Sequence, residues 1–346
     1  MWYHHWGVIL YYIKNTVGNC FHREISMPIG IIPLVDYAFK MLLGNQHHPR
    51  VTIHFLNAVL GGKHRISQIE FISPIQQKRN ADDMVCILDI LAIDEYGRRL
   101  NIEVQMSMPA GMAQRLFYYV SRTWVDQLHE GQGYLELQPS ICICVMAGQL
   151  FASPPVLHLD FRMRDSQHSV TLTEDVQIHV LQLNHLQVTE ETVYHASPVE
   201  RWAWFLRHAE GLTSDQVARL FPDEEFSEAA EVLEMIAQTP QHLVEYNARL
   251  KAQRDEEARI LYAQQQGKAE GLAEGLAEGL AEGIDIGRRQ GIDIGVEKGV
   301  LIGQIALLQK FLRQPVWPEQ QFQQYGVDKL RDMATDLQQK FDAQHS

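Results

Sequence analysis

Apolar side chains recur at every second position through the stretch RRLNIEVQMS, from Arg98 to Ser107, which is the pattern of a β-strand with one buried face. A second apolar run, DMVCILDILAID, precedes it. Glu95, Tyr96 and Gly97 separate the two runs, so we expect a β-hairpin closed by a short turn that contains glycine. An acid and an amide, Glu103 and Gln105, interrupt the second strand, and burying a carboxylate without a partner is unfavourable by several kcal/mol.

The rest of the N-terminal half mixes helical and strand-like spacing. Helices are expected in DYAFKMLLG, with Asp36 as its N-cap, in RVTIHFLNAVLGG, which ends at Gly61 and Gly62, and in AQRLFYYVSRTWVDQL. Further strands are expected in ISQIEFISPI, as an edge strand before Pro74, and in SICICVMAG, LHLDFRMRD and VQIHVLQLN. This order predicts an α/β fold with a mixed sheet flanked by helices.

From PVERWAWFLRHAE onward the chain is expected to be mostly helical, followed by a low-complexity tail. Ten glycines recur every four residues from Gly267 to Gly303, and each weakens an isolated helix by about 0.5 to 1 kcal/mol relative to alanine. The glycines form no fixed face, because a four-residue step turns an α-helix by about 40°. Two interpretations stay open, a weak helix or tether expanded by repeat slippage in the DNA, and a helix for self-association. The last segments, VLIGQIALLQKFLRQ and EQQFQQYGVDKLRDMATDLQQKF, are expected to pack back on each other or to pair between chains.

These patterns divide the chain into five parts. They are an N-terminal extension (1–28), a sheet domain (29–195), a helical region (196–266), the glycine repeat (267–303) and C-terminal helices (304–346). Met27 is a candidate second start, so the extension is not assured to be native. No targeting signal and no membrane-spanning segment are expected. Cys142 and Cys144 resemble small core residues rather than metal ligands, which fits a reducing cytoplasm.

The net charge of −13 argues against a polyanionic partner when it is taken for the whole chain. The charge is unevenly distributed, however. Residues 1–150 contain 12 Lys and Arg and 12 Asp and Glu, whereas residues 151–346 contain 18 and 31. The N-terminal half is therefore neutral and compatible with nucleic acid, above all with a metal ion bound at its acids.

A turn at Glu95–Gly97 places Asp89 directly opposite Glu103 in the hairpin. Asp89, Glu103 and Gln105 then project from one face of the sheet. The other face is expected to carry the apolar side chains of Cys86, Leu88, Ile90, Ala92, Leu100, Ile102, Val104 and Met106. Two facing carboxylates repel unless a cation lies between them, and oxygen ligands of this kind suit Mg²⁺ or Mn²⁺. The alternative is a pair of acids satisfied by arginine or backbone donors, with Gln105 hydrogen-bonded inside the sheet.

An acid in one strand, a hairpin turn and then Glu-x-Gln resembles the PD-(D/E)xK nuclease superfamily. More narrowly, IIPLVDYAFKMLLG, FLNAVL, DILAIDEYGRRLNIEVQ and QRLFYYVSRTW resemble, in order and separation, the Rpn family of recombination-promoting nucleases and transposases. In this family glutamine replaces the usual lysine. The resemblance implies a restriction-endonuclease-like fold.

Carried over residue by residue, the resemblance implies that Asp89 and Glu103 bind Mg²⁺, helped by the backbone carbonyl of Val104. Gln105 would orient the attacking water or an incoming phosphate in place of the lysine. Asp36 matches the first acidic motif and would reach the metal through water, a role compatible with that of an N-cap.

Three side chains on the helix after the hairpin are candidates for substrate binding: Gln114, Arg115 and Tyr118. Arg115 is a candidate phosphate clamp, although it would also suit a solvated helix face. Tyr118, Tyr119 and Phe117 more often serve core packing than base stacking.

The function expected from these features is a Mg²⁺-dependent DNA endonuclease of the bacterial cytoplasm that is tied to recombination or mobile DNA. The alternative is a DNA-binding or assembly protein that keeps the nuclease fold with little or no catalytic activity and forms homo-oligomers through its tail. No feature of the sequence distinguishes DNA from RNA.

Overall fold

A computed structural model of the chain describes residues 27–62, 65–76 and 86–345, with the side chains of Gln76, Cys86 and His345 left aside. Residues 1–26 of the expected extension, and residues 83–85 of the first expected hairpin strand, lie outside the described residues. The chain divides into two compact units, which meet between Ala258 and Arg259. Each unit is considered by itself.

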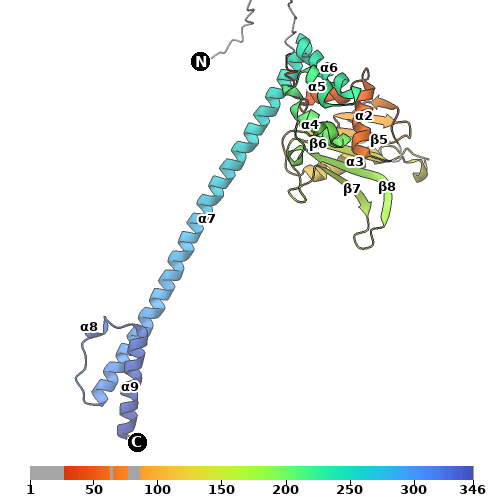
Figure 1. Cartoon of the computed structure of the whole chain (residues 1–346). Coiled ribbons are helices and arrows are strands. Elements are labelled where there is room, and N and C mark those ends of the chain that lie inside the picture. Colours follow the sequence, from red (N-terminus) through yellow and green to blue (C-terminus); the bar gives the residue numbers. More distant parts are fainter. Residues whose placement is uncertain (1–26, 63–64, 77–85, 346) are drawn as a thin grey trace, which may run out of the picture. The chain divides into compact units, whose positions relative to one another are not determined.

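A six-stranded mixed sheet forms the centre of the first unit (Figure 1). Its strands, in chain order, are β1 (Ile69–Ile72), β4 (Ile90–Asp94), β5 (Arg99–Gln105), β6 (Ser140–Met146), β7 (His158–Arg164) and β8 (Thr171–Gln182). They lie side by side in the order β1-β4-β5-β6-β8-β7, with β5, β6 and β8 parallel. The expected edge strand, β1, is at the edge. A separate small sheet pairs β2 (Ile75–Gln76) with β3 (Cys86–Ile87).

The expected hairpin is formed by β4 and β5. Ile90 pairs with Ile102 and Ile93 with Arg99, which is the register that a turn at Glu95–Gly97 requires. Gly97 has a φ of +79°, a conformation that favours glycine and closes the turn. Glu103 therefore lies across from Asp89, as the sequence predicted.

The expected apolar face is correct for most of the hairpin and wrong for Leu88. Ile90, Leu100, Ile102 and Val104 belong to the main hydrophobic cluster, whereas Leu88 packs with Leu91 on the opposite side. The alternation fails because the chain bends between β3 and β4, so that Leu88 and Asp89 do not continue the pleat of β4.

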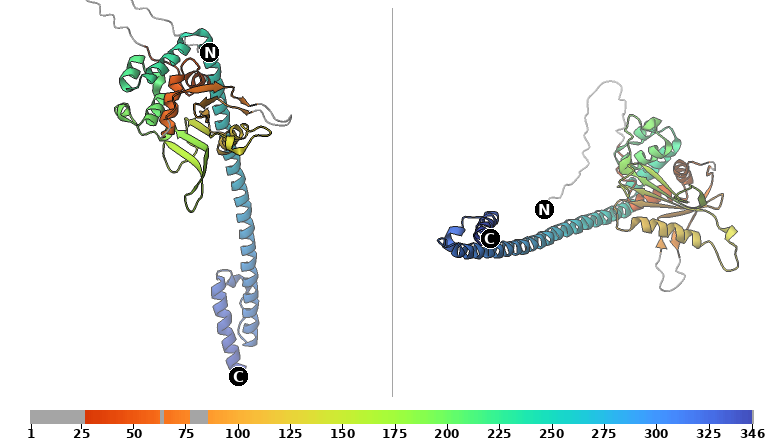
Figure 2. Two further views of the ribbon diagram at one scale, coloured as in Figure 1. Left: turned by 90° about the vertical axis from the view of Figure 1, so that its right-hand side faces the viewer. Right: turned by 90° about the horizontal axis from the view of Figure 1, so that it is seen from below.

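Helices cover both faces of the sheet (Figure 2). The helices of the first unit that precede the long one are α1 (Asp36–Leu43), α2 (Pro49–Leu60), α3 (Met112–Val125), α4 (Pro198–His208), α5 (Ser214–Leu220) and α6 (Glu224–Gln238). Short 3₁₀ helices occupy Tyr134–Glu136, Leu183–His185, Val193–His195 and Ala209–Gly211. Side chains of α1, α2, α4, α5 and α6 share one cluster with one sheet face, and α3 packs on the other face through an apolar stripe of every fourth residue.

The helices after residue 195 belong to the same core as the sheet. Trp202, Phe205 and Phe226 are fully buried in the main cluster together with side chains of α1 and β5. The first turns of α7 (Pro240–Phe311) are joined to this unit, because the Tyr37 hydroxyl lies 2.6 Å from Nδ1 of His242. Residue 195, where a boundary was expected, thus falls inside the first unit.

The second unit holds the rest of α7, which is helical throughout the glycine repeat, together with α8 (Glu319–Phe322) and α9 (Val327–His345). Ile305, Phe322 and Leu330 are buried in a small hydrophobic cluster of their own. The terminal segments therefore pack back on each other, which was the first of the two arrangements expected from the sequence. No helix of the described part of the chain is both long and apolar enough to cross a membrane.

Candidate active site

The acids lie at the end of the sheet where β4 begins and β5 ends. Asp89 immediately precedes β4, and Glu103 and Gln105 are among the last three residues of β5. The carboxyl ends of parallel strands are where α/β sheets usually bind ligands. The hairpin register and the pleat of β5 together bring the two acids to this end.

Asp89 and Glu103 are joined through the backbone. The amide of Asp89 donates a hydrogen bond to Oε1 of Glu103 at 3.3 Å, and the amide of Val104 donates to Oδ2 of Asp89 at 3.0 Å. Glu103 is fully buried, and the Asp89 side chain is 17% exposed. Part of the alternative expectation is therefore correct, since backbone donors hold both carboxylates.

A lysine that the sequence reasoning did not select completes the group. Nζ of Lys40, on α1, lies 2.7 Å from Oδ1 of Asp36 and 3.1 Å from Oδ1 of Asp89. The expected N-cap role of Asp36 is wrong, because Val35 occupies that position and Asp36 is the first helical residue. Its carboxylate instead faces Lys40 one turn along the helix, and Nε of Arg249 is 4.0 Å from its other oxygen.

Burial dominates the electrostatics of the acids. Burial first, and then the negative charge of Asp89, raise the pKa of Glu103 from its ordinary 4.5 to about 8. Burial also raises the pKa of Asp89, although the charge of Lys40 and the Val104 amide oppose this. The pKa of Lys40 is lowered by burial, but the hydrogen bond to Asp36 and the charges of Asp89 and Asp36 outweigh this, so it lies above its usual value. Lys40 neutralises Asp89, but Glu103 has no such partner among the described residues, so a further positive charge beside Glu103 would stabilise its charged form.

The acid pair fits a divalent metal ion. Oε2 of Glu103 is buried and has no hydrogen bond within the described part of the chain. An unsatisfied buried carboxylate oxygen is costly, and a metal ion satisfies it. Among the described residues no group of three or more His, Cys, Asp or Glu is arranged to hold a metal. Two carboxylates nevertheless match Mg²⁺, because water and substrate phosphate normally complete its shell.

Gln105 lies two residues beyond Glu103 on the same strand. Its side chain is half-buried, and no hydrogen bond to its amide occurs among the residues that the structure describes. The alternative expectation, an amide bonded within the sheet, is therefore not what the structure contains. The predicted metal contact of the Val104 carbonyl stays a prediction, since the structure shows only its amide bonded to Asp89.

The three candidates on α3 differ in their relation to the acids. The charge of Arg115 acts on both Glu103 and Asp89, and its Nε donates to the Tyr119 hydroxyl at 2.6 Å. Gln114 and Tyr118 are exposed, and no contact of theirs with the acids is present in the described ranges. Core packing was the wrong expectation for Tyr118 and Phe117, which are 42% and 54% exposed, because the buried stripe of α3 contains other residues. They are Met112, Leu116, Val120 and Thr123.

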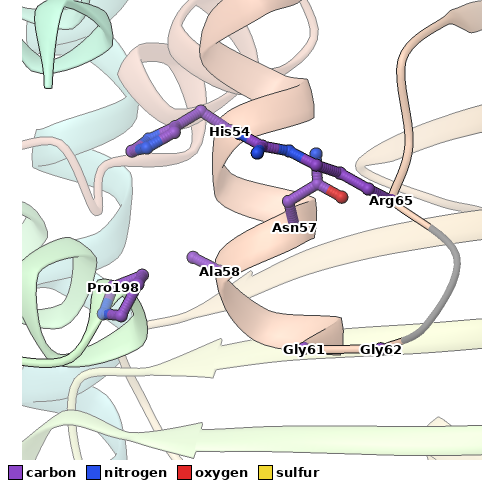
Figure 3. A pocket seen from close by; sticks show the side chains of 7 residues that line it. All are labelled: His54, Asn57, Ala58, Gly61, Gly62, Arg65 and Pro198. Carbon is purple, nitrogen blue, oxygen red and sulfur yellow. The ribbon is translucent and has the colours of Figure 1, made fainter.

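A cavity of about 210 Å³ opens beside the lysine and the acid. Lys40 and Asp89 line it together with Gly44 of the α1 end and Leu91 of β4. A different cavity, of about 290 Å³, lies beside α2 and is lined by His54, Asn57, Arg65 and Pro198 among others (Figure 3). Asn57 of this second cavity bonds both the amide and the carbonyl of Ile66, and none of the described residues that line it is an acid. The first cavity is the one that an acid of the pair, Asp89, lines.

Lys40 was missed because a lysine in the last turn of an amphipathic helix looks like an ordinary surface residue. A signal was present in the sequence: Asp36 and Lys40 are four residues apart, which puts an acid and a cation on one helix face. The contact with Asp89 depends on how α1 packs against β4, and local spacing carries no such information.

Comparison with known proteins agrees with this geometry. The family profile described as PD-(D/E)XK nuclease family transposase matches residues 33–263, which span the sheet, its helices and the start of α7. The chain belongs to the PD-(D/E)XK nuclease family transposases. Neither the comparison with curated proteins nor that with solved structures gives a match. The family assignment confirms the expected superfamily and the restriction-endonuclease-like fold class.

Proposed function

We propose that this chain is a Mg²⁺-dependent DNA endonuclease that acts in recombination or in the movement of mobile DNA. The observation that carries the proposal is the pairing of Asp89 with Glu103, whose buried Oε2 lacks a hydrogen bond within the described residues. The family match supports a nuclease-related function. The free, buried thiols of Cys142 and Cys144 agree with action in a reducing bacterial cytoplasm.

Asp89 and Glu103 would hold the metal ion, and Mn²⁺ would suit the same oxygen ligands. When bound there, a divalent ion polarises a phosphate and lowers the pKa of a water molecule. Gln105 would orient the attacking water with its amide, in the place where the superfamily motif has a lysine. Arg115, whose charge already acts on both acids, would bind a phosphate oxygen of the DNA.

The reaction is the hydrolysis of a phosphodiester. The oxygen of a water molecule forms a bond to phosphorus while the bond from phosphorus to the leaving oxygen breaks. One proton of the water ends on the leaving oxygen, which becomes a hydroxyl, and the other is released to solvent. Backbone amides fix both carboxylates before any substrate arrives, so the site is preorganised for this chemistry.

A plasmid-cleavage assay with and without Mg²⁺ tests the proposal. Glu103→Gln keeps the shape of the side chain and removes its charge, and we expect cleavage to fall at least about a hundredfold. Glu130→Gln, at an exposed glutamate of the same unit, is the matched control and should cleave like the parent. Cleavage that needs no divalent ion, or that survives in Glu103→Gln, would count against the proposal.

A second function, assembly through the tail, is favoured by the exposed apolar residues of α7. Leu272, Leu276 and Leu280 are 64% to 75% exposed. Sedimentation of the full chain and of a variant with these three leucines changed to glutamate tests assembly separately from cleavage. An oligomer that the variant turns into a monomer with unchanged cleavage would support assembly, and equal masses would count against it.

A further inference from the structure

Lys40 contacts an acid of the candidate site from a helix outside the hairpin. Its Nζ lies 3.1 Å from Oδ1 of Asp89, although the two residues are far apart in sequence. The contact with Asp36, at 2.7 Å, holds the lysine from its other side. Among the described residues, Lys40 is the only Lys or Arg with a salt bridge to either Asp89 or Glu103.

The ammonium group of Lys40 is accessible to solvent. The Lys40 side chain is 37% exposed, and it lines the cavity of about 210 Å³ that Asp89 also lines. A phosphate that enters this cavity would therefore meet a cation beside an acid. A lysine has three donors on a flexible stem, so it can turn from a carboxylate to a phosphate oxygen without a change of backbone.

The strand position next to the acids carries no charge. Gln105 offers a half-buried amide, so the hairpin contributes two acids and no cation to the site. Arg115 is the other cation whose charge acts on Glu103, but its Nε is bonded to the Tyr119 hydroxyl and its guanidinium lies 5.2 Å from the centre of that ring. Lys40 is thus the cation that already touches an acid and faces the cavity.

We infer that Lys40 supplies the positive charge that the strand position of Gln105 lacks, and that its Nζ binds a phosphate oxygen of the DNA at the reacting centre. The inference rests on the proposed function. In the absence of DNA, Lys40 is the counter-ion of Asp89. With DNA bound, it leaves that carboxylate free for a metal ion, while Asp36 keeps the ammonium directed at the site.

The test is a set of full-length variants with two readouts, Mg²⁺-dependent plasmid cleavage and the salt dependence of binding to a short DNA duplex without metal. Lys40→Met should lower cleavage by roughly tenfold to a thousandfold and should lower the slope of log affinity against log salt by about one, the loss of one phosphate contact. Lys40→Arg should keep the slope. Lys251→Met removes an exposed lysine of the same unit and should keep parental cleavage.

The decisive variant moves the charge back to the strand. Lys40→Met combined with Gln105→Lys should regain at least tenfold in cleavage over Lys40→Met alone, a rescue that the loss of a merely structural ion pair does not permit. If Lys40→Met fails to fold, Lys40→Gln carries the same comparison, because it removes the charge and keeps a hydrogen-bond donor on the side chain.

Failure of the inference differs from failure of the proposed function. A parent that cleaves with Mg²⁺ while Lys40→Met cleaves equally well overturns the inference alone. A Lys40→Met variant that loses cleavage, keeps the parental salt slope and gains nothing from Gln105→Lys also overturns it, because the lysine then serves only the ion pairs. If the parent does not cleave with Mg²⁺ or Mn²⁺, the proposed function fails. If Lys40→Met then also has the parental slope of log affinity against log salt, the inference is overturned as well.

Discussion

The amide of Asp89 donates to Oε1 of Glu103 at 3.3 Å, and the amide that follows Glu103 donates to Oδ2 of Asp89 at 3.0 Å. Each acid is thus held by the backbone of the other strand. These bonds hold the pair in place, although Glu103 is fully buried and burial disfavours the charged form of both carboxylates.

This arrangement makes the stability of the metal-free protein depend on pH. The pKa of Glu103 rises from 4.5 to about 8 on folding, so the folded state binds more protons than the unfolded state between these values. The contribution of Glu103 to stability is therefore fully present below pH 4.5 and is lost as the pH rises toward 8. We expect the parent to lose roughly 1 to 3 kcal/mol more than Glu103→Gln between pH 5 and pH 8.5, which is measurable by urea denaturation. Parallel curves for the two proteins would contradict this expectation.

Binding of a divalent ion should release a proton from Glu103. Because the pKa of Glu103 is about 8, its carboxyl group is protonated at neutral pH in the metal-free protein, and metal binds the charged form. The affinity for Mn²⁺ should rise with pH up to about 8 and then level off. Calorimetry in buffers of different ionisation enthalpy counts the released proton. Glu103→Gln should show neither the release nor the rise, whereas an affinity of the parent that is flat in pH would contradict the prediction.

Local periodicity and turn chemistry were enough to predict the hairpin and its register. The turn at Gly97 determined the strand register, and the register brought Asp89 to Glu103. Contacts that depend on packing between distant elements, or on a bend in the chain, could not be predicted from local patterns. Lys40 reaches Asp89 only because α1 packs beside β4, and Leu88 changes face because the chain bends just before that strand.

The turn of the hairpin gives a test of how much the register depends on one side chain. Asp94 is 5% exposed; its Oδ1 accepts from the amides of Tyr96 and Arg98, at 3.0 and 2.9 Å, and its Oδ2 accepts from Nε of Arg98 at 2.6 Å. Asp94→Ala removes a buried carboxylate together with its three hydrogen bonds, and we expect a loss of about 2 to 4 kcal/mol in the free energy of unfolding.

Asp165 provides the matched control for the hairpin turn. It accepts from the amides of Gln167 and His168 in the same manner, but its side chain is 39% exposed. Water can replace the lost bonds there, so Asp165→Ala should lose less than about 1 kcal/mol. Thermal unfolding of both variants beside the parent gives the comparison, and equal losses would show that burial does not set the energy of this turn.

The glycine repeat allows its two interpretations to be separated by adding methyl groups. A Cβ at Gly275, Gly279 or Gly283 would meet no other atom within 4 Å, so alanine fits the helix without strain. Alanine in place of each glycine should stabilise the helix by about 0.5 to 1 kcal/mol. We expect the triple variant to melt at a higher temperature by circular dichroism at the helical band, with the same mass as the parent in sedimentation. That outcome indicates a tether.

Self-association through the repeat predicts the opposite result. Glycine permits close approach of two helices, and added methyl groups at the contact would separate them and lower the mass. The reverse changes, Ala273→Gly, Ala277→Gly and Ala281→Gly, remove methyl groups from the same repeats and should weaken the helix in either case. Assembly is supported if the alanine variant has a lower mass than the parent, while the glycine variant loses helix stability and keeps the parental mass. Only contact between helices makes an added methyl group unfavourable.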